Sequence, residues 1–162
     1  MFLKSKLLKV EKPQIIFTDF DGCLTDDRVW VNQEGEEFVA ANRKDGLASQ
    51  KLAALGIKVV ISSSEKNLVV GARGKKMGVE VLQGLKDKAS ELEIYLESKN
   101  LYWSDVWYIG NDVNDLTAIS KAALSICPSD AVIQVKRVVD YKLKTKGGYG
   151  IISEIAEILG AK

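Results

Sequence analysis

Apolar runs and amphipathic segments alternate along the chain, and this pattern predicts strands and helices in turn. The first expected strand is a run of four apolar or β-favouring residues, Ile15 to Thr18. Further strands are expected from Ile57 into Ser62–Ser64, at 79–82 and 105–109, and as short outer strands at 123–127 and 138–141. Helices are expected at 44–55, 65–77, 87–98 and 149–159, with shorter ones ending at Lys121 and beginning near Ser129. This alternation predicts an α/β fold in which helices cover both faces of a parallel sheet.

One segment breaks the alternation, because two β-rich runs follow each other without a helix between them. Residues 28–32 and 36–40 flank a polar turn that ends in Gly35, and together they predict a β-hairpin inserted at 27–42. Its apolar side chains are too many for a two-stranded flap left alone in water. They are Val29, Trp30, Val31, Phe38 and Val39. We therefore expect the hairpin to pack against another subunit, the alternative being that it folds back on its own domain.

The first expected strand runs directly into two carboxylates, Asp19 and Asp21, and a glycine follows. Because side chains alternate along a strand, the two acids would face the same side of an extended chain. Carboxylates held so close repel each other unless a cation lies between them, and oxygen ligands suit a hard cation such as Mg²⁺. An aspartate can also attack phosphorus and form an aspartyl-phosphate. Without further context, however, Asp-x-Asp-Gly is more often an ordinary acidic turn.

Two further strands also end in polar residues. The second expected strand ends in Ser62–Ser64, where a hydroxyl and a backbone N–H can hold a phosphoryl oxygen, although three serines alone indicate only a loop. The strand at 105–109 ends in Gly110, and Asn111, Asp112 and Asp115 follow it. Ligands of parallel α/β folds lie beyond the carboxyl ends of the strands, which is where each of these clusters falls.

Composition limits the chemistry and the partners. The chain has 162 residues, 46% of them apolar, which fits one domain with a substantial core and leaves no room for a second full domain. Its formal net charge is +1 with both signs interspersed, so no basic field indicates nucleic acid or an anionic membrane as a partner. Histidine is absent, which excludes Ser-His-Asp and Cys-His triads and histidine zinc sites.

The cysteines and the N-terminus indicate a cytoplasmic protein. Cys23 and Cys127 lie far apart without a metal-binding spacing, which favours reduced thiols. No apolar run approaches the roughly 18 residues that a membrane span needs. Residues 1–12 alternate lysine with leucine without the apolar region of a signal peptide, so we interpret them as a tail or a fraying helix.

The segment from Asp19 to Asp26 reads Asp-x-Asp-Gly-x-Leu-Thr-Asp and resembles the first motif of the haloacid dehalogenase-like phosphatase superfamily. The resemblance implies that Asp19 is the nucleophile and Asp21 the general acid/base, with both near Mg²⁺. It also implies a Rossmann-like three-layer sandwich with a parallel central sheet, in which the small hairpin stands in place of a cap domain.

The other motifs of the superfamily imply the remaining roles. A serine or threonine ends the second strand of the pattern, and Ser63 matches it, with Ser62 as the alternative. A lysine beside a helix start would neutralise the nucleophile and the transferred phosphoryl group, and Lys88 matches better than Lys86. The fourth motif normally has an acid directly after its glycine, whereas this chain has Asn111.

The metal ligands implied by the resemblance are therefore unusual for the superfamily. They are the Asp19 carboxylate, the backbone carbonyl of Asp21, and either Asn111 or Asp112. An asparagine carbonyl can ligate Mg²⁺ but brings no charge, and Mg²⁺ sites favour one or two carboxylates.

Four features together look like the 3-deoxy-manno-octulosonate 8-phosphate phosphatase group. They are the hairpin in place of a cap, Lys44-Asp45-Gly46, Gln83-Gly84 before the lysine, and Lys146-Gly147-Gly148-x-Gly150. Relatives of that group include phosphatases of nonulosonic-acid 9-phosphates and the C-terminal domains of sialic acid cytidylyltransferases, toward which Asn111 points. The resemblance implies a homotetramer whose hairpins assemble centrally and whose neighbouring subunit caps each active site.

Two functions are consistent with these residues. One is a Mg²⁺-dependent phosphomonoesterase for a phosphorylated 2-keto-3-deoxy sugar acid, with Arg43, Lys44, Asp45 and Gly46 as substrate-binding residues. Basic side chains there would form charge-assisted contacts with the substrate carboxylate. The other is a non-catalytic tetramerisation module. Asn111 favours the module, whereas the retained acids, hydroxyl and lysine favour the enzyme, because a structural domain has little use for clustered carboxylates.

Overall fold

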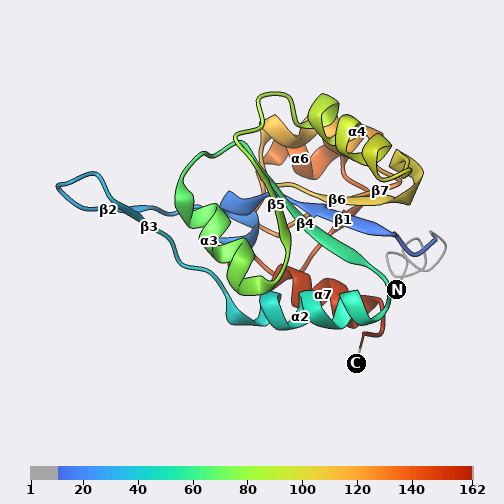
Figure 1. Cartoon of the computed structure of the whole chain (residues 1–162), viewed down its shortest axis with the longest axis horizontal. Coiled ribbons are helices and arrows are strands. Elements are labelled where there is room, and N and C mark those ends of the chain that lie inside the picture. The colour runs from blue at the N-terminus through green and yellow to red at the C-terminus, as the bar shows by residue number, and fades with distance from the viewer. Residues whose placement is uncertain (1–10, 162) are drawn as a thin grey trace.

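A computed structural model of the chain describes residues 11–161, so the first ten residues of the predicted tail lie outside the described part. Six parallel strands form one sheet in the order β5-β4-β1-β6-β7-β8 (Figure 1). In chain order they are β1 (Ile15–Thr18), β4 (Lys58–Ser63), β5 (Glu80–Gln83), β6 (Val106–Ile109), β7 (Leu124–Cys127) and β8 (Tyr141–Lys142). The predicted α/β fold with a parallel central sheet is confirmed.

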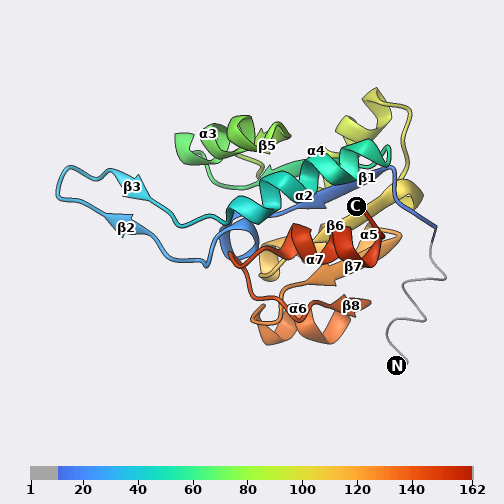
Figure 2. The ribbon, with the colours of Figure 1, turned by 90° about the horizontal axis from the view of Figure 1, so that it is seen from below.

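Helices cover both faces of this sheet (Figures 1 and 2). One face packs against α2 (Arg43–Ala54), α3 (Leu68–Met77) and α7 (Ile151–Ile158). The other face packs against α4 (Lys88–Ser98), α5 (Leu116–Lys121) and α6 (Ile133–Val138). Strand β1 is buried on both sides: Ile16 belongs to the first core, and Ile15 and Phe17 to the second. This explains why β1 is a continuous apolar run rather than an alternating one.

The order of the strands fixes where a ligand can bind. Strand β1 pairs with β4 on one side and with β6 on the other, and Thr18 lies opposite both Ile61 and Ile109. The chain leaves β1 toward β4 and later returns on the β6 side, so the connections diverge at the carboxyl end of β1. In open α/β sheets such a switch point is where the ligand crevice forms.

The predicted hairpin is present, with strands β2 (Trp30–Val31) and β3 (Glu37–Phe38) joined in antiparallel register. It projects away from the sheet and the helices (Figures 1 and 2). Trp30 is 70% exposed and Phe38 56% exposed, and Val39 packs against the core. The hairpin therefore does not fold back on its own domain, and its packing against another subunit stays a prediction.

Several element boundaries differ from those expected, for local reasons. Helix α3 begins at Leu68 rather than Glu65, because Asn67 caps it by accepting the N–H of Val69. Helix α7 begins at Ile151 because Gly150, with φ of 99°, stands before it in a left-handed conformation. The prediction of an outer strand at 138–141 is wrong at its start, because Val138 ends a helix and the strand begins only at Tyr141.

Residues 133–138 form α6 instead, and the strand that follows is β8, at Tyr141–Lys142. No helix within residues 11–161 has the length and apolar character needed to cross a membrane.

Candidate active site

Asp19 follows β1 directly and lies at the switch point of the sheet. Its backbone N–H continues the β1–β6 ladder by donating to the Ile109 carbonyl at 2.9 Å. Its carboxylate Oδ1 accepts the N–H of Phe20 at 2.7 Å. The chain then turns sharply through Phe20–Leu24, where Gly22 has φ of 70°. Strand pairing therefore fixes the backbone of Asp19, and the turn directs its side chain, which is only 6% exposed.

Lys88 is the cation that the structure brings to Asp19. It is the first residue of α4, behind the N-cap Asp87, and it is 2% exposed. Its Nζ lies 2.8 Å from Asp19 Oδ2 and 2.7 Å from Asp115 Oδ1. Lys86, the other candidate, is exposed. The geometry therefore favours Lys88, as the sequence had indicated.

Asp115 is the part of this cluster that the sequence analysis did not include among the site residues. Its Oδ1 accepts from Lys88 and, at 2.7 Å, from the Tyr108 phenol, while its Oδ2 accepts the backbone N–H groups of Asn111 and Asp112. The available signal was its place as the second acid after Gly110. Nothing in the sequence showed that Tyr108, on β6, would reach it.

The charges of this cluster shift one another's ionisation. Burial, together with the Asp115 carboxylate, raises the pKa of Asp19 to about 7, and Lys88 opposes that rise. Burial alone would lower the pKa of Lys88, but the Asp19 and Asp115 carboxylates outweigh it and raise that pKa above its ordinary value. The lysine is thus held in its charged form, and negative charge remains in excess around it.

Asp21 lies two residues after Asp19 in a more open position. Its Oδ1 accepts the Thr25 hydroxyl at 3.2 Å, and the residue is only partly buried. Desolvation raises its pKa above the ordinary value, and the Thr25 hydrogen bond opposes the rise. A carboxyl group with these surroundings can hold a proton and still reach solvent, as a general acid must.

The two candidate serines lie at the carboxyl end of β4 but differ in their partners. The Ser62 hydroxyl donates to the Thr18 carbonyl at 3.3 Å, and it lies beside the Tyr108 phenol, whose pKa it lowers against the rise caused by burial. The Ser63 hydroxyl accepts the Glu65 N–H at 3.1 Å. Ser62 is thus tied into the buried network, and Ser63 into the loop that leaves the strand. The role of Ser63 as phosphate ligand stays a prediction.

Of the two alternative metal ligands, Asn111 lies against the acidic loop, by which we mean residues 19–26. Its side-chain oxygen is 3.8 Å from the Cys23 thiol, and its amide would clash with any Cβ added at Gly22. The Asp112 carboxylate instead caps the turn that follows it, accepting the Val113 N–H. Within residues 11–161 no three Asp, Glu, His or Cys side chains converge as a metal-binding group.

A mixed set of oxygen donors nevertheless fits a hard cation. The Asp19 carboxylate, the Asp21 carbonyl and the Asn111 amide belong to neighbouring segments of one cluster with surplus negative charge. Mg²⁺ is usually held by one or two carboxylates and keeps several of its waters, so such a set satisfies its preferences.

The predicted substrate-binding residues occupy the first turn of α2. Arg43 and Lys44 are exposed, whereas Asp45 is 1% exposed and accepts the Ile152 N–H of α7 at 2.8 Å. Arg43 lines a pocket of about 420 Å³ together with Asp26 and Gly148.

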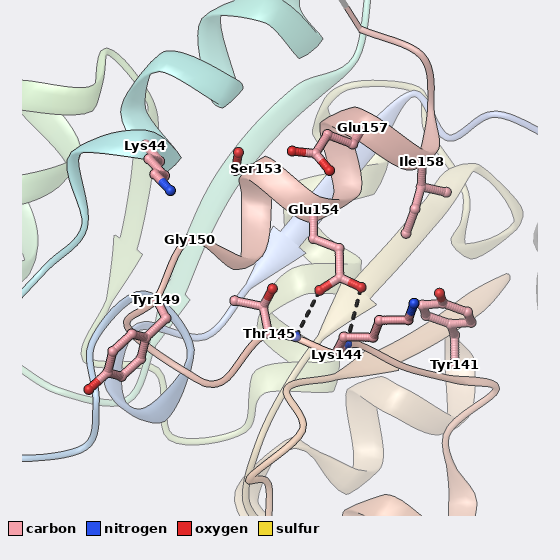
Figure 3. Close-up of a pocket in the computed structure, with 10 residues that line it drawn as sticks. All are labelled: Lys44, Tyr141, Lys144, Thr145, Tyr149, Gly150, Ser153, Glu154, Glu157 and Ile158. Atoms are coloured by element: carbon pink, nitrogen blue, oxygen red, sulfur yellow. Dashed lines mark hydrogen bonds between the residues drawn. The ribbon is translucent and has the colours of Figure 1, made fainter.

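A second pocket of about 510 Å³ lies along α7, where the Lys44 side chain points toward Gly150 (Figure 3). The Glu154 carboxylate at its floor accepts the backbone N–H groups of Lys144 and Thr145. Neither pocket is lined by Asp19, Asp21 or Lys88.

Fold and site together define the class of protein. The sequence pattern of the haloacid dehalogenase-like hydrolases matches residues 57–155, and the chain belongs to this family. More particularly, it is similar to 3-deoxy-D-manno-octulosonate 8-phosphate phosphatases. It is 28% identical to the phosphatase KdsC of Haemophilus influenzae, over 93% of this chain and 84% of that protein.

Two further relatives extend the comparison. The corresponding phosphatase of Moraxella catarrhalis, solved with a magnesium ion, a phosphate ion and a KDO molecule, is 31% identical, with a TM-score of 0.89 over 99% of this chain and 92% of that one. N-acylneuraminate cytidylyltransferase of Oncorhynchus mykiss is 32% identical over 91% of this chain. The chain spans only 36% of that protein's length, so the resemblance concerns about a third of it.

Proposed function

We propose that the protein is a Mg²⁺-dependent phosphomonoesterase that hydrolyses a phosphorylated 2-keto-3-deoxy sugar acid. The observation that carries this proposal is the buried contact between Asp19 and Lys88, 2.8 Å long, at the carboxyl end of the central strand. A nucleophilic carboxylate there has beside it Lys88, which among residues 11–161 is the one buried lysine and can neutralise a phosphoryl group. The similarity to octulosonate phosphatases supports the same function.

In the first step Asp19 attacks phosphorus in line with the sugar oxygen. A bond forms between the carboxylate oxygen and phosphorus while the bond from phosphorus to the sugar oxygen breaks. Asp21, whose pKa is raised above its ordinary value by partial burial, gives its proton to the leaving oxygen. Lys88 and the Ser63 hydroxyl hold the phosphoryl oxygens.

In the second step a water molecule attacks phosphorus of the aspartyl-phosphate. Asp21, now ionised, takes the proton of that water, and the bond between phosphorus and Asp19 breaks. Inorganic phosphate leaves, and both carboxyl groups return to their starting state. The Thr25 hydroxyl, 3.2 Å from Asp21, keeps this side chain in one orientation through both steps.

A divalent cation, when bound, supplies positive charge that offsets the phosphoryl oxygens and the surplus of carboxylates. The Asp19 carboxylate, the Asp21 carbonyl and Asn111 would hold it. Mg²⁺ is the natural choice for an all-oxygen set, and a magnesium ion is present in the Moraxella catarrhalis phosphatase structure.

The sugar acid is proposed to lie toward the base of the hairpin. The pocket lined by Arg43 and Asp26 adjoins the acidic loop there, and the Arg43 guanidinium can form a charge-assisted contact with a carboxylate. Lys44, exposed on the same helix turn, is the second candidate for that contact.

We further propose that the protein works as a homotetramer joined through its hairpins. The exposed apolar side chains of β2 and β3 support this, because a projecting two-stranded flap with Trp30 and Phe38 in water is unfavourable. A neighbouring subunit would then complete the pocket near Arg43.

The test is phosphate release from octulosonate 8-phosphate and from nonulosonate 9-phosphates in the presence of Mg²⁺. Turnover of one of these substrates that disappears in Asp19→Asn supports the phosphatase and identifies Asp19 as the nucleophile. Lack of turnover above the Asp19→Asn control with every substrate contradicts it.

Such a failure would favour the alternative, a non-catalytic assembly module. The similarity to about a third of a cytidylyltransferase and the presence of Asn111 are the observations behind that alternative.

A measurement of thermal stability tests the metal independently of turnover. A ligand that binds only the folded protein stabilises it, and at 100 times its dissociation constant the gain is about 2.7 kcal/mol. We expect millimolar Mg²⁺ to raise the melting temperature of the wild type and to have no such effect on Asn111→Ala. An equal response of both proteins would exclude Asn111 as a ligand.

A further inference from the structure

Two sequence motifs take no part in the two phosphoryl-transfer steps proposed above, and the structure brings them together. They are Lys44-Asp45-Gly46 in the first turn of α2 and the glycine loop, by which we mean residues 146–150, directly before α7. Asp45 Oδ1 accepts the Ile152 N–H at 2.8 Å, a contact between residues 107 positions apart in the chain.

Asp45 is committed to this contact by burial. It is 1% exposed, and the Ser153 N–H lies near its carboxylate and stabilises the charged form. Its other oxygen, Oδ2, is buried without a hydrogen-bond partner among the described residues, and Arg73 of α3 is the neighbouring positive charge. A carboxylate at the N-terminus of a helix is favourable because the first N–H groups of the helix lack partners within it.

The glycine loop lies directly on the backbone of the acidic loop. The Gly148 N–H donates to the Cys23 carbonyl at 2.8 Å. A Cβ added at Gly147 would lie 2.1 Å from the Gly22 carbonyl oxygen, and one at Gly148 would lie 2.6 Å from the Asp26 nitrogen. Only glycine permits this approach, so the position of the glycine loop sets the path of the backbone that carries Asp21 and Thr25.

We propose that Asp45 is a positioning residue that anchors the first turn of α7 and, through the glycine loop, holds the acidic loop in the geometry that Asp21 needs. For its kinetic consequence this inference rests on the phosphatase function proposed above. The contact path itself consists of two hydrogen bonds, from Ile152 to Asp45 and from Gly148 to Cys23, which are joined by the short stretch of chain between Gly148 and Ile152.

The inference distinguishes positioning from direct substrate binding. Positioning of the acid/base residue affects kcat, because the reacting groups are misplaced, whereas loss of a substrate contact made equally throughout the reaction raises KM. Asp45→Ala should lower kcat about tenfold to a hundredfold with KM within about twofold of the wild type. Asp45→Asn should recover part of the loss, because its amide oxygen can accept the Ile152 N–H.

A matched control is available just before the edge strand β8. Asp140 Oδ2 accepts the backbone N–H and the hydroxyl of Ser125, near the start of β7. Asp140→Ala removes hydrogen bonds that involve neither the glycine loop nor the acidic loop, and its kcat should stay within about twofold of the wild type. An equal fall of kcat in both variants would show that the effect is general destabilisation and would overturn the proposal.

Hydrogen exchange at the Gly148 amide tests the same path without substrate. The exchange should be faster in Asp45→Ala than in the wild type and unchanged in Asp140→Ala. If Asp45→Ala does not fold, the exchange is measured in Asp45→Asn instead. Unchanged exchange in both Asp45 variants, or a raised KM with unchanged kcat, overturns the positioning role. Lack of turnover in the wild type contradicts only the phosphatase function, and the exchange result then decides the inference.

Discussion

At the scale of single residues, Asp115 organises the charged cluster, because four donors converge on its two oxygens. They are the Lys88 ammonium, the Tyr108 phenol and the backbone N–H groups of Asn111 and Asp112. Lys88 contacts one oxygen of Asp19 and one oxygen of Asp115, and Asp115 is itself fixed by three further hydrogen bonds. Asp115 therefore determines the position of the lysine ammonium. A buried cation with two carboxylates keeps its charge, which is what phosphoryl transfer requires of it.

Replacement of Asp115 should therefore be costly. In Asp115→Asn the new side chain has an NH₂ group in place of one carboxylate oxygen. This group must face either Lys88 and Tyr108 or the backbone N–H groups of Asn111 and Asp112, all of which are donors. Lys88 also loses one of its two carboxylate partners. We expect the free energy of unfolding, measured in urea, to fall by about 3–5 kcal/mol. Asp112→Asn removes the same charge from a half-buried cap and should change it by less than about 0.5 kcal/mol. Similar losses in the two variants would contradict the role given to Asp115.

A second residue-scale prediction concerns Asp45 and pH. Burial raises the pKa of Asp45 from 3.8 to about 6, although the backbone N–H groups of Ile152 and Ser153 and the charge of Arg73 oppose the rise. The folded protein therefore binds this proton more tightly than the unfolded chain does, and its contribution to stability falls as pH rises from about 4 to 6.

Asp45→Asn is neutral throughout, so its stability relative to the wild type should increase over that pH range. The relative gain is at most about 3 kcal/mol and should level off above pH 7. Urea unfolding of both proteins at several pH values measures it. A constant difference between them would show that Asp45 ionises normally in the folded protein.

At the scale of elements, the site depends on loops that follow the strands, and the glycine loop is the most constrained of them. The Gly22 carbonyl oxygen lies only 2.1 Å from the position that a Cβ of residue 147 would take. The sequence indicated that these glycines are a feature of the resemblance to octulosonate phosphatases and lie at the start of a helix, but not what they contact. Their function is to let two backbone segments touch, which depends on a loop more than a hundred residues earlier in the chain.

Gly147→Ala should thus damage both stability and activity. The new Cβ meets the Gly22 backbone at 2.1 Å, and backbone on both sides cannot give way without moving the acidic loop. We expect a loss of about 1–3 kcal/mol in the free energy of unfolding and a lower kcat for phosphate release. In Gly71→Ala the added Cβ meets the flexible Gln83 side chain at 3.2 Å within α3, so stability should hold or rise by up to about 1 kcal/mol. Normal kcat in Gly147→Ala would contradict the proposed contact.

Element types followed from the sequence more reliably than their ends did. The apolar patterns of β1, β4, β6 and β7 and of α2 and α4 were sufficient to predict these strands and helices. Burial in a sheet or on one face of a helix imposes such patterns. The start of α3 depended on the Asn67 cap, and that of α7 on the backbone of Gly150. Caps of this kind are single side-chain or dihedral choices, which a periodic pattern does not encode.

At the scale of the whole molecule, the hairpin is the feature that a lone chain does not explain. Four of its apolar side chains, Val29, Trp30, Val31 and Phe38, are exposed, whereas the described remainder of the chain buries two extensive cores. The hairpin projects away from the sheet and the helices (Figure 2). Water-exposed apolar surface of this kind is typical of an interface between subunits. The proposed tetramer would bury it and place a neighbour beside the Arg43 pocket.

Charges on the hairpin should consequently prevent assembly. We expect the double variant Trp30→Asp, Phe38→Asp to be monomeric by light scattering, with a normal fold by circular dichroism. Tyr102→Asp changes an equally exposed aromatic, 73% accessible, away from the hairpin and should leave the oligomer intact. A monomeric wild type would remove the tetramer proposal, and an oligomeric double variant would place the interface elsewhere.

The sequence by itself determined the parallel α/β fold, the family and the hairpin. It also led to Lys88 as the partner of Asp19, which the structure places 2.8 Å from it. These features are local: an apolar run followed by acids, a lysine beside a helix start, two β-rich runs around a turn. The strand, its acids and the hairpin can be predicted from neighbouring residues because burial and turn chemistry act over a few positions. The choice of Lys88 came from the resemblance to the superfamily motif.

Only the tertiary structure decided how these pieces meet. It joined Tyr108 and Asp115 to Lys88, placed Asn111 rather than Asp112 against Gly22, and buried Asp45 under a helix that begins 106 residues after it. Such contacts depend on the order of strands in the sheet and on the packing of helices upon it. No local pattern specifies them, because they arise from the pairing of segments that are distant along the chain.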